Sequence, residues 1–160
     1  MSTTTATPEI GQLAPDFKLK GPGAQAVTLS EYRGQKNVVL VFYPLAFSPT
    51  CSHHLPAIQN ELPKFERLDA VVLGVSVDSH HANTAFARHL GLGFPLLSDF
   101  KREAMAAYGV LMPEAGYSGR AVFVIDKQGR IACKEIAASP GDLSQIPSND
   151  RVLAALQALK

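Results

Sequence analysis

Two runs dominated by aliphatic residues, Val38–Tyr43 and Val71–Val77, constrain the fold of this chain more than any other feature. A strand with one face in water alternates apolar and polar residues, whereas a strand covered on both faces of a mainly parallel sheet is apolar along its length. Both runs are also far shorter than the ~20 residues that a membrane-spanning helix needs. They therefore predict central strands of a parallel sheet, and they argue against a membrane protein.

The segment between the two runs has the spacing of an amphipathic helix. Apolar side chains recur there at steps of three and four and form one buried stripe: Leu55, Ile58, Leu62, Phe65 and Leu68. Pro63 lies inside the stripe and should kink the helix, because proline has no backbone N–H to donate.

Helices and strands continue to alternate along the rest of the chain. Ser79 is expected to cap a helix whose inward face is Ala82, Ala85, Phe86 and Leu90. A strand over residues 94–97 and a short helix over 102–108, ending at Gly109, should follow. Strands over 121–125 and 130–136 are expected to form a hairpin around the turn at 126–129. Ser148 is expected to cap a last helix, with Val152, Leu153, Leu156 and Leu159 turned inward.

The order of these elements predicts the fold class. Two short strands, residues 16–19 and the stretch around Val27 and Leu29, flank a turn at Gly21-Pro22-Gly23. Parallel β-α-β units followed by a hairpin and a packing helix indicate a thioredoxin-like α/β sandwich: a central mixed β-sheet flanked by helices, with an N-terminal β-hairpin extension. We expect residues 9–160 to form a single domain and residues 1–8 to form a flexible arm.

Charge and cysteine content exclude several classes of function. The formal net charge is +1 and no Lys/Arg run is dense enough to track phosphates, so nucleic acid is not an expected partner. Two cysteines, Cys51 and Cys133, are too few for a disulfide scaffold, and the N-terminus lacks the basic and apolar regions of a secretory signal. We therefore expect a cytoplasmic protein in which an important cysteine is reactive.

The segment from Phe42 to Cys51 carries the strongest chemical signal. Cys51 follows a buried strand and falls in the first turn of the next helix, where unpaired N–H groups and the helix dipole favour a thiolate over a thiol. Ser48 could direct its hydroxyl at the sulfur and at a bound oxygen, and Pro44 would shape the loop and shield the sulfur from water. This arrangement suits a nucleophilic cysteine.

The pattern Pro44-x-x-x-Ser48-x-x-Cys51 resembles the peroxiredoxin motif, with Ser where Thr is more common. Four further segments resemble the same family and extend the likeness over nearly the whole chain: Ala14-Pro15-Asp16-Phe17, residues 94–99, Tyr108-Gly109-Val110, and Gly119-Arg120 with the strand after it. The string Pro44-Leu45-Ala46-Phe47 resembles most the one-cysteine alkyl hydroperoxide reductase E type, and next the bacterioferritin-comigratory-protein type.

This resemblance implies a thiol-dependent peroxidase that acts on hydrogen peroxide and organic hydroperoxides and needs no metal or organic cofactor. Cys51 would be the peroxidatic cysteine, oxidised to a sulfenic acid, and Arg120 would hold the thiolate and the peroxide. An external low-molecular-weight thiol or a thioredoxin- or glutaredoxin-like protein would restore the thiol. The resemblance also implies a homodimer, with which the apolar residues Ala46 and Phe47 are compatible.

Several alternatives remain open at this stage. Pro56 occupies the place where the comigratory-protein type often has a resolving cysteine, and Cys133, expected to point the same way as Ile131, reads better as a small buried apolar side chain. A thioredoxin-type disulfide oxidoreductase is disfavoured because position 54 is His and no C-x-x-C motif exists. A peroxide sensor or holdase would use the same cysteine. His54 could tune Cys51 or face solvent, and a metal site at His53, His54, His80 and His81 is disfavoured because no chelating spacing occurs.

Overall fold

The computed structural model describes residues 6–159. Residues 1–5 of the expected N-terminal arm lie outside this range, while Pro8, at the end of that arm, is buried. The strands are β1 (Lys18–Lys20), β2 (Ala26–Thr28), β3 (Asn37–Phe42), β4 (Ala70–Ser76), β5 (Leu96–Ser98), β6 (Leu111–Met112), β7 (Tyr117–Ser118), β8 (Ala121–Ile125) and β9 (Ile131–Ile136). The helices are α1 (Cys51–Asn60), α2 (Leu62–Arg67), α3 (His80–Leu90), α4 (Glu103–Ala107) and α5 (Asn149–Gln157), with short 3-10 turns at Pro22–Ala24, Leu29–Tyr32 and Leu143–Gln145.

Seven of the strands form one mixed sheet in the order β2-β1-β5-β4-β3-β8-β9. Strands β3, β4 and β5 are parallel, as the apolar runs predicted, while β8 and β9 add to β3 as an antiparallel hairpin. The N-terminal hairpin of β1 and β2 extends the opposite edge through β5. The thioredoxin-like α/β sandwich with an N-terminal hairpin extension is therefore confirmed.

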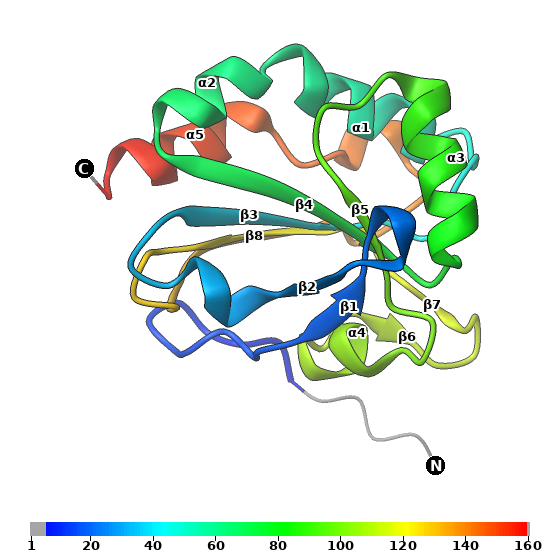
Figure 1. Cartoon of the computed structure of the whole chain (residues 1–160), viewed down its shortest axis with the longest axis horizontal. Coiled ribbons are helices and arrows are strands. Elements are labelled where there is room, and N and C mark those ends of the chain that lie inside the picture. Colours follow the sequence, from blue (N-terminus) through cyan, green and yellow to red (C-terminus); the bar gives the residue numbers. More distant parts are fainter. Residues whose placement is uncertain (1–5, 160) are drawn as a thin grey trace.

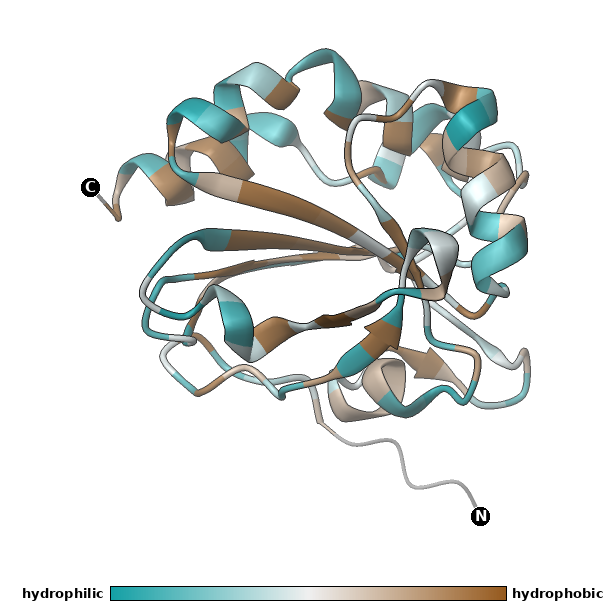
Figure 2. Cartoon of the chain, in the orientation of Figure 1, coloured by the Kyte–Doolittle hydropathy of each residue, from teal (hydrophilic) through white to brown (hydrophobic). Residues whose placement is uncertain are grey.

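Both faces of the sheet are covered, so the core has two halves. Helices α1, α2, α3 and α5 lie over one face, and α4 with the β6–β7 ribbon lies toward the other (Figure 1). Side chains of β3 alternate between the halves: Val39 and Val41 join the α1 side, and Val38, Leu40 and Phe42 join the α4 side. Figure 2 shows the central strands in the hydrophobic colour and the helices in both colours.

Three details of the packing differ from the sequence-based expectation. The long helix breaks at Glu61 into α1 and α2, with Pro63 in the first turn of α2, so the proline separates two helices and does not merely bend one. In α3 the buried positions are Asn83 and Phe86, whereas Ala85 is exposed. Leu159 is 38% exposed because α5 ends at Gln157.

A β-bulge corrects the expected direction of Cys133. The register of β8 and β9 shifts between Val124 and Ile125, so Ile131 pairs with Ile125 and Cys133 pairs with Val124. Ile131 therefore packs into the α4 half of the core, and Cys133 packs against the α1 half. The two side chains do not point the same way.

No helix among residues 6–159 is long and apolar enough to cross a lipid bilayer.

Candidate active site

Cys51 lies at the start of helix α1, after the loop that connects it to the central strand β3. The loop of residues 43–50 leaves the end of β3, and α1 begins at Cys51 itself. The Cys51 backbone N–H has no backbone hydrogen-bond acceptor in the described part of the chain, as expected for the first turn of a helix. The Cys51 side chain is 0% exposed. The sulfur thus lies beside an unpaired donor in an enclosed position.

Arg120, which is distant from Cys51 in the sequence, places its guanidinium next to this sulfur. It directly precedes β8, which pairs with β3, so the sheet carries it to the end of β3 where Cys51 lies. Its Nη2 donates a hydrogen bond to Cys51 Sγ at 3.0 Å, and its side chain is only 1% exposed. Within residues 6–159 Arg120 makes no ion pair with a carboxylate. A thiolate on Cys51 would therefore be its nearest available counter-charge.

Two further contacts fix the position of Arg120. Its Nε donates to the carbonyl of Pro140 at 3.0 Å, and its Nη1 lies 2.9 Å from His54 Nδ1. The segment around Pro140 is tied to the start of α1 as well, since Thr50 Oγ1 donates to the carbonyl of Gly141 at 3.0 Å. No sequence motif predicted these contacts between the site and the backbone of residues 140–141.

His54 is a buried part of the site and does not face solvent. It lies one helical turn after Cys51 and is 1% exposed. Burial, and then the charge of Arg120, lower the pKa of His54 to about 3, so the imidazole is neutral near pH 7. Because Arg120 donates to Nδ1, the proton lies on Nε2, which is buried and has no partner within residues 6–159. The i, i+3 spacing from Cys51 was the sequence signal for this placement.

The loop before Cys51 holds the other two sequence-predicted residues. Pro44 is buried and Ser48 is partly buried. The Ser48 carbonyl accepts from Ser52 N–H at 3.0 Å, but its hydroxyl makes no hydrogen bond to Cys51 Sγ in this structure. Phe47, between them, adopts a left-handed backbone (φ 66°) that costs free energy in a non-glycine residue and packs on Phe86 with ring centroids 4.9 Å apart.

A buried polar network supports the end of β3 beneath this loop. Tyr43 is 0% exposed and its hydroxyl donates to Asn83 Oδ1 at 2.6 Å. The Asn83 amide in turn donates to Ser76 Oγ at 3.0 Å and to the Leu97 carbonyl at 3.2 Å. Burial raises the pKa of Tyr43, so this residue is a structural wall of the site rather than an acid. The network joins α3, β4 and β5 to the residue before Pro44.

Cys133 lies in the middle of the edge strand β9 and is partly buried. Burial, followed by the charge of Glu135, raises the pKa of its thiol, which disfavours the nucleophilic thiolate. Among residues 6–159, no group of three His, Cys, Asp or Glu side chains is arranged to hold a metal ion.

Known proteins resemble this chain over most of its length. The AhpC/TSA family matches residues 10–134. Alkyl hydroperoxide reductase E of Mycobacterium tuberculosis is 41% identical over 151 residues, covering 93% of this chain and 98% of the relative. The chloroplastic 2-Cys peroxiredoxin BAS1 of Hordeum vulgare is 37% identical and covers 96% and 76%. The crystal structure of peroxidoxin BcpB from M. tuberculosis superimposes with a TM-score of 0.83 at 27% identity, covering 96% and 99%.

Proposed function

Because this chain belongs to the AhpC/TSA family, whose members include the peroxiredoxins, we propose that Cys51 is the residue at which it reduces hydroperoxides. The protein is an enzyme, a thiol-dependent peroxidase, with a hydroperoxide as substrate and a reductant as partner. Its relatives are named as reductases and peroxiredoxins, so a sensor or holdase role is not favoured. The observation that supports Cys51 best is the buried hydrogen bond from Arg120 to its sulfur.

In the proposed chemistry the Cys51 thiolate attacks the nearer oxygen of ROOH. The S–O bond forms as the O–O bond breaks, and with one proton taken up the products are a sulfenic acid and ROH. The sulfur is thereby oxidised by two electrons and the peroxide is reduced. The guanidinium of Arg120 and the Cys51 N–H stabilise the negative charge that moves onto the leaving oxygen.

Pro44 and Ser48 complete the proposed site. Pro44 is buried in the loop that precedes Cys51, where it would help to keep water from the sulfur. The Ser48 hydroxyl is free of hydrogen bonds to the rest of residues 6–159, so it is available to donate to a bound peroxide oxygen. His54 contributes no charge of its own and orients Arg120 through Nδ1.

We infer a one-cysteine mechanism. Cys133 packs against apolar residues in an edge strand and its thiol is disfavoured as a nucleophile, so the sulfenic acid is restored from outside the chain. An external thiol attacks the Cys51 sulfur and releases water, and a second thiol equivalent then breaks the mixed disulfide. A low-molecular-weight thiol or a thioredoxin- or glutaredoxin-like protein supplies both equivalents.

The setting of the enzyme is also part of the proposal. Both cysteines are free thiols, which fits a reducing compartment such as the cytoplasm. Leu45 and Phe47 are 37% and 53% exposed on the loop before Cys51, and such adjacent apolar side chains fit the contact surface of a homodimer. Sedimentation of wild type and a Phe47→Lys variant tests this, because a dimer through that loop would dissociate in the variant.

Mass spectrometry after a stoichiometric peroxide pulse tests the catalytic assignment. With a sulfenic-acid trap present, the adduct is expected on Cys51 in wild type and in Cys133→Ser, and steady turnover with an external thiol should persist in Cys133→Ser. Cys51→Ser should lose all turnover and keep its fold, because the change removes the nucleophile and little volume. Turnover in Cys51→Ser would refute the site. A Cys51–Cys133 disulfide that is required for turnover would refute the one-cysteine mechanism alone.

A further inference from the structure

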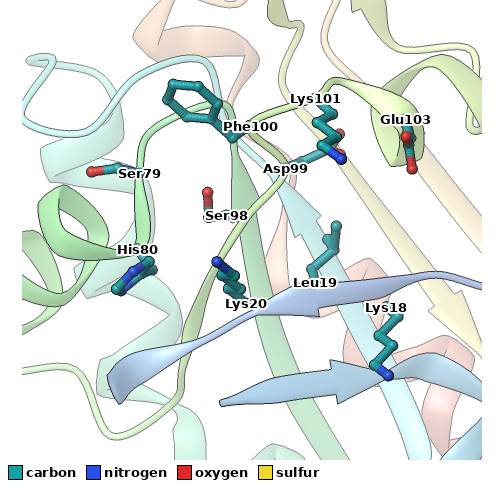
Figure 3. A pocket seen from close by; sticks show the side chains of 10 residues that line it. All are labelled: Lys18, Leu19, Lys20, Ser79, His80, Ser98, Asp99, Phe100, Lys101 and Glu103. Carbon is teal, nitrogen blue, oxygen red and sulfur yellow. The ribbon is translucent and has the colours of Figure 1, made fainter. Parts of the chain in front are cut away.

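A pocket lies apart from Cys51, between strand β1, the loop after β5 and the start of α3. It has a volume of about 420 Å³, within the range of small-molecule sites, and none of the residues that surround Cys51 line it (Figure 3). Lys20 and Lys101 extend into it from opposite sides, the first from β1 and the second from the loop after β5.

The lysines around this pocket differ from the other described lysines of the chain. Four lysines in residues 6–159 pair with a carboxylate: Lys36, Lys64, Lys127 and Lys134. The other three, Lys18, Lys20 and Lys101, form no ion pair within the described residues, and all three line this pocket. Uncompensated positive charge thus gathers at one concave site.

Ser98 adds a hydroxyl that is open to the pocket and has no hydrogen-bond partner within residues 6–159. It is only 9% exposed, it lines the pocket, and its hydroxyl makes no hydrogen bond within residues 6–159. Because no protein group occupies this hydroxyl, it can donate a hydrogen bond to a ligand oxygen in the pocket. Ser98 is the cross-strand neighbour of Lys20, so the two side chains lie on the same face of the sheet.

The acidic residues at the pocket offset the positive charge of the lysines only in part. The Asp99 carboxylate is 1% exposed and accepts hydrogen bonds from the N–H groups of Ala104 and Met105, so helix α4 already compensates it. Glu103 lines the pocket, is exposed and forms no ion pair within residues 6–159, so it offsets one of the three lysine charges. His80, at the start of α3, has a lowered pKa because of partial burial and then His81 and Lys20, which fits a positive local potential.

We propose that this pocket binds a small molecule through a phosphate group. A phosphate offers several acceptor oxygens and more than one negative charge, which matches the ammonium groups of Lys20 and Lys101 together with the Ser98 hydroxyl. Leu19 and the exposed ring of Phe100 provide apolar surface for an organic remainder. The proposal does not depend on the peroxidase chemistry, because the pocket shares no residue with the site at Cys51.

Calorimetric titration with pyrophosphate and, separately, with adenosine monophosphate tests the proposal, with chloride holding the ionic strength constant. Wild type is expected to bind at least one of the two saturably. The double variant Lys20→Gln, Lys101→Gln should bind it at least tenfold more weakly, because two charge-assisted contacts are lost. Ser98→Ala should bind a few-fold more weakly, whereas Lys36→Gln, the matched control at a paired lysine, should bind like wild type.

Peroxide reduction serves as the check on folding, since all of these variants should retain wild-type turnover. Tighter binding of the nucleotide than of pyrophosphate would place its organic part on Leu19 and Phe100. Equal affinity of wild type and the double variant, or no saturable binding of either probe, would overturn the proposal and leave the assignment of Cys51 untouched. If the double variant fails to fold, Ser98→Ala, which removes one oxygen atom, still tests the proposal: affinity equal to wild type would contradict it.

Discussion

Replacing Arg120 by Ala should slow the oxidation of Cys51 by about two orders of magnitude. The guanidinium donates to Sγ over 3.0 Å between two side chains that are at most 1% exposed, so water does not substitute for it. A hydrogen bond to a charged group contributes about 1.5–3 kcal/mol, which corresponds to roughly 10- to 150-fold in rate. Loss of one preorganised donor to a developing anion typically costs about 10²- to 10³-fold, and the two ranges overlap near a hundredfold.

The rate constant for sulfenic-acid formation should be measured by rapid quench with a trap and mass spectrometry, because the chain has no Trp to report by fluorescence. Arg120→Lys keeps the charge, yet a single ammonium cannot reach Sγ, His54 Nδ1 and the Pro140 carbonyl together, so it should recover only part of the rate. Arg130→Ala, at an exposed arginine, is the matched control. A folded Arg120→Ala protein with the wild-type rate constant would refute the reasoning.

Three further outcomes follow from buried polar groups. Folding lowers the pKa of His54 from 6.5 to about 3, so as pH falls the unfolded chain binds a proton on His54 before the folded chain does, and stability is lost between about pH 6.5 and pH 3. His54→Gln should therefore flatten the dependence of the free energy of unfolding on pH. The control His53→Gln, at an exposed histidine, should leave that dependence unchanged. Asn83→Ala should lower that free energy at neutral pH by about 1–3 kcal/mol in urea unfolding, because it leaves the buried hydroxyl of Tyr43 without a partner; a loss under 0.5 kcal/mol would contradict the network. Asp99→Ala should cost about 1–2 kcal/mol by uncapping α4, and a circular dichroism melt equal to wild type would count against that role.

The sheet was predictable because burial on both faces leaves a direct mark on sequence. The run from Val38 to Phe42 must satisfy two halves of the core at once, so every position is apolar, and its parallel pairing with β4 follows. Serine N-caps at Ser79 and Ser148 were also predictable, since each hydroxyl accepts from a backbone N–H two or three residues on. The position of Cys51 at a helix start follows from the same local logic.

Contacts between residues that are distant in the sequence could not be predicted in this way. Asn83 is fully buried and hydrogen-bonded to Tyr43, which follows β3, to Ser76 in β4 and to the Leu97 carbonyl in β5, and no helical periodicity reveals these contacts. The bulge at Val124 shifts the register between β8 and β9, and such a shift cannot be read from one strand alone. The alternation of side-chain directions along β9 therefore predicted the wrong direction for Cys133. For the site itself, Arg120 was found only through family resemblance, and the burial of His54 against it required the structure.

If Cys51 is the residue that is oxidised, we expect the guanidinium of Arg120 to link the redox state of the enzyme to its thermal stability. In the proposed mechanism a Cys51 thiolate would neutralise Arg120, which has no carboxylate partner in residues 6–159. Once that sulfur becomes an uncharged sulfenic acid, the cation is left alone in a medium that solvates it poorly, and the native state loses free energy. Each turnover would then pass through an oxidised form with a lower melting temperature, and reduction of Cys51 would restore the stability of the native state.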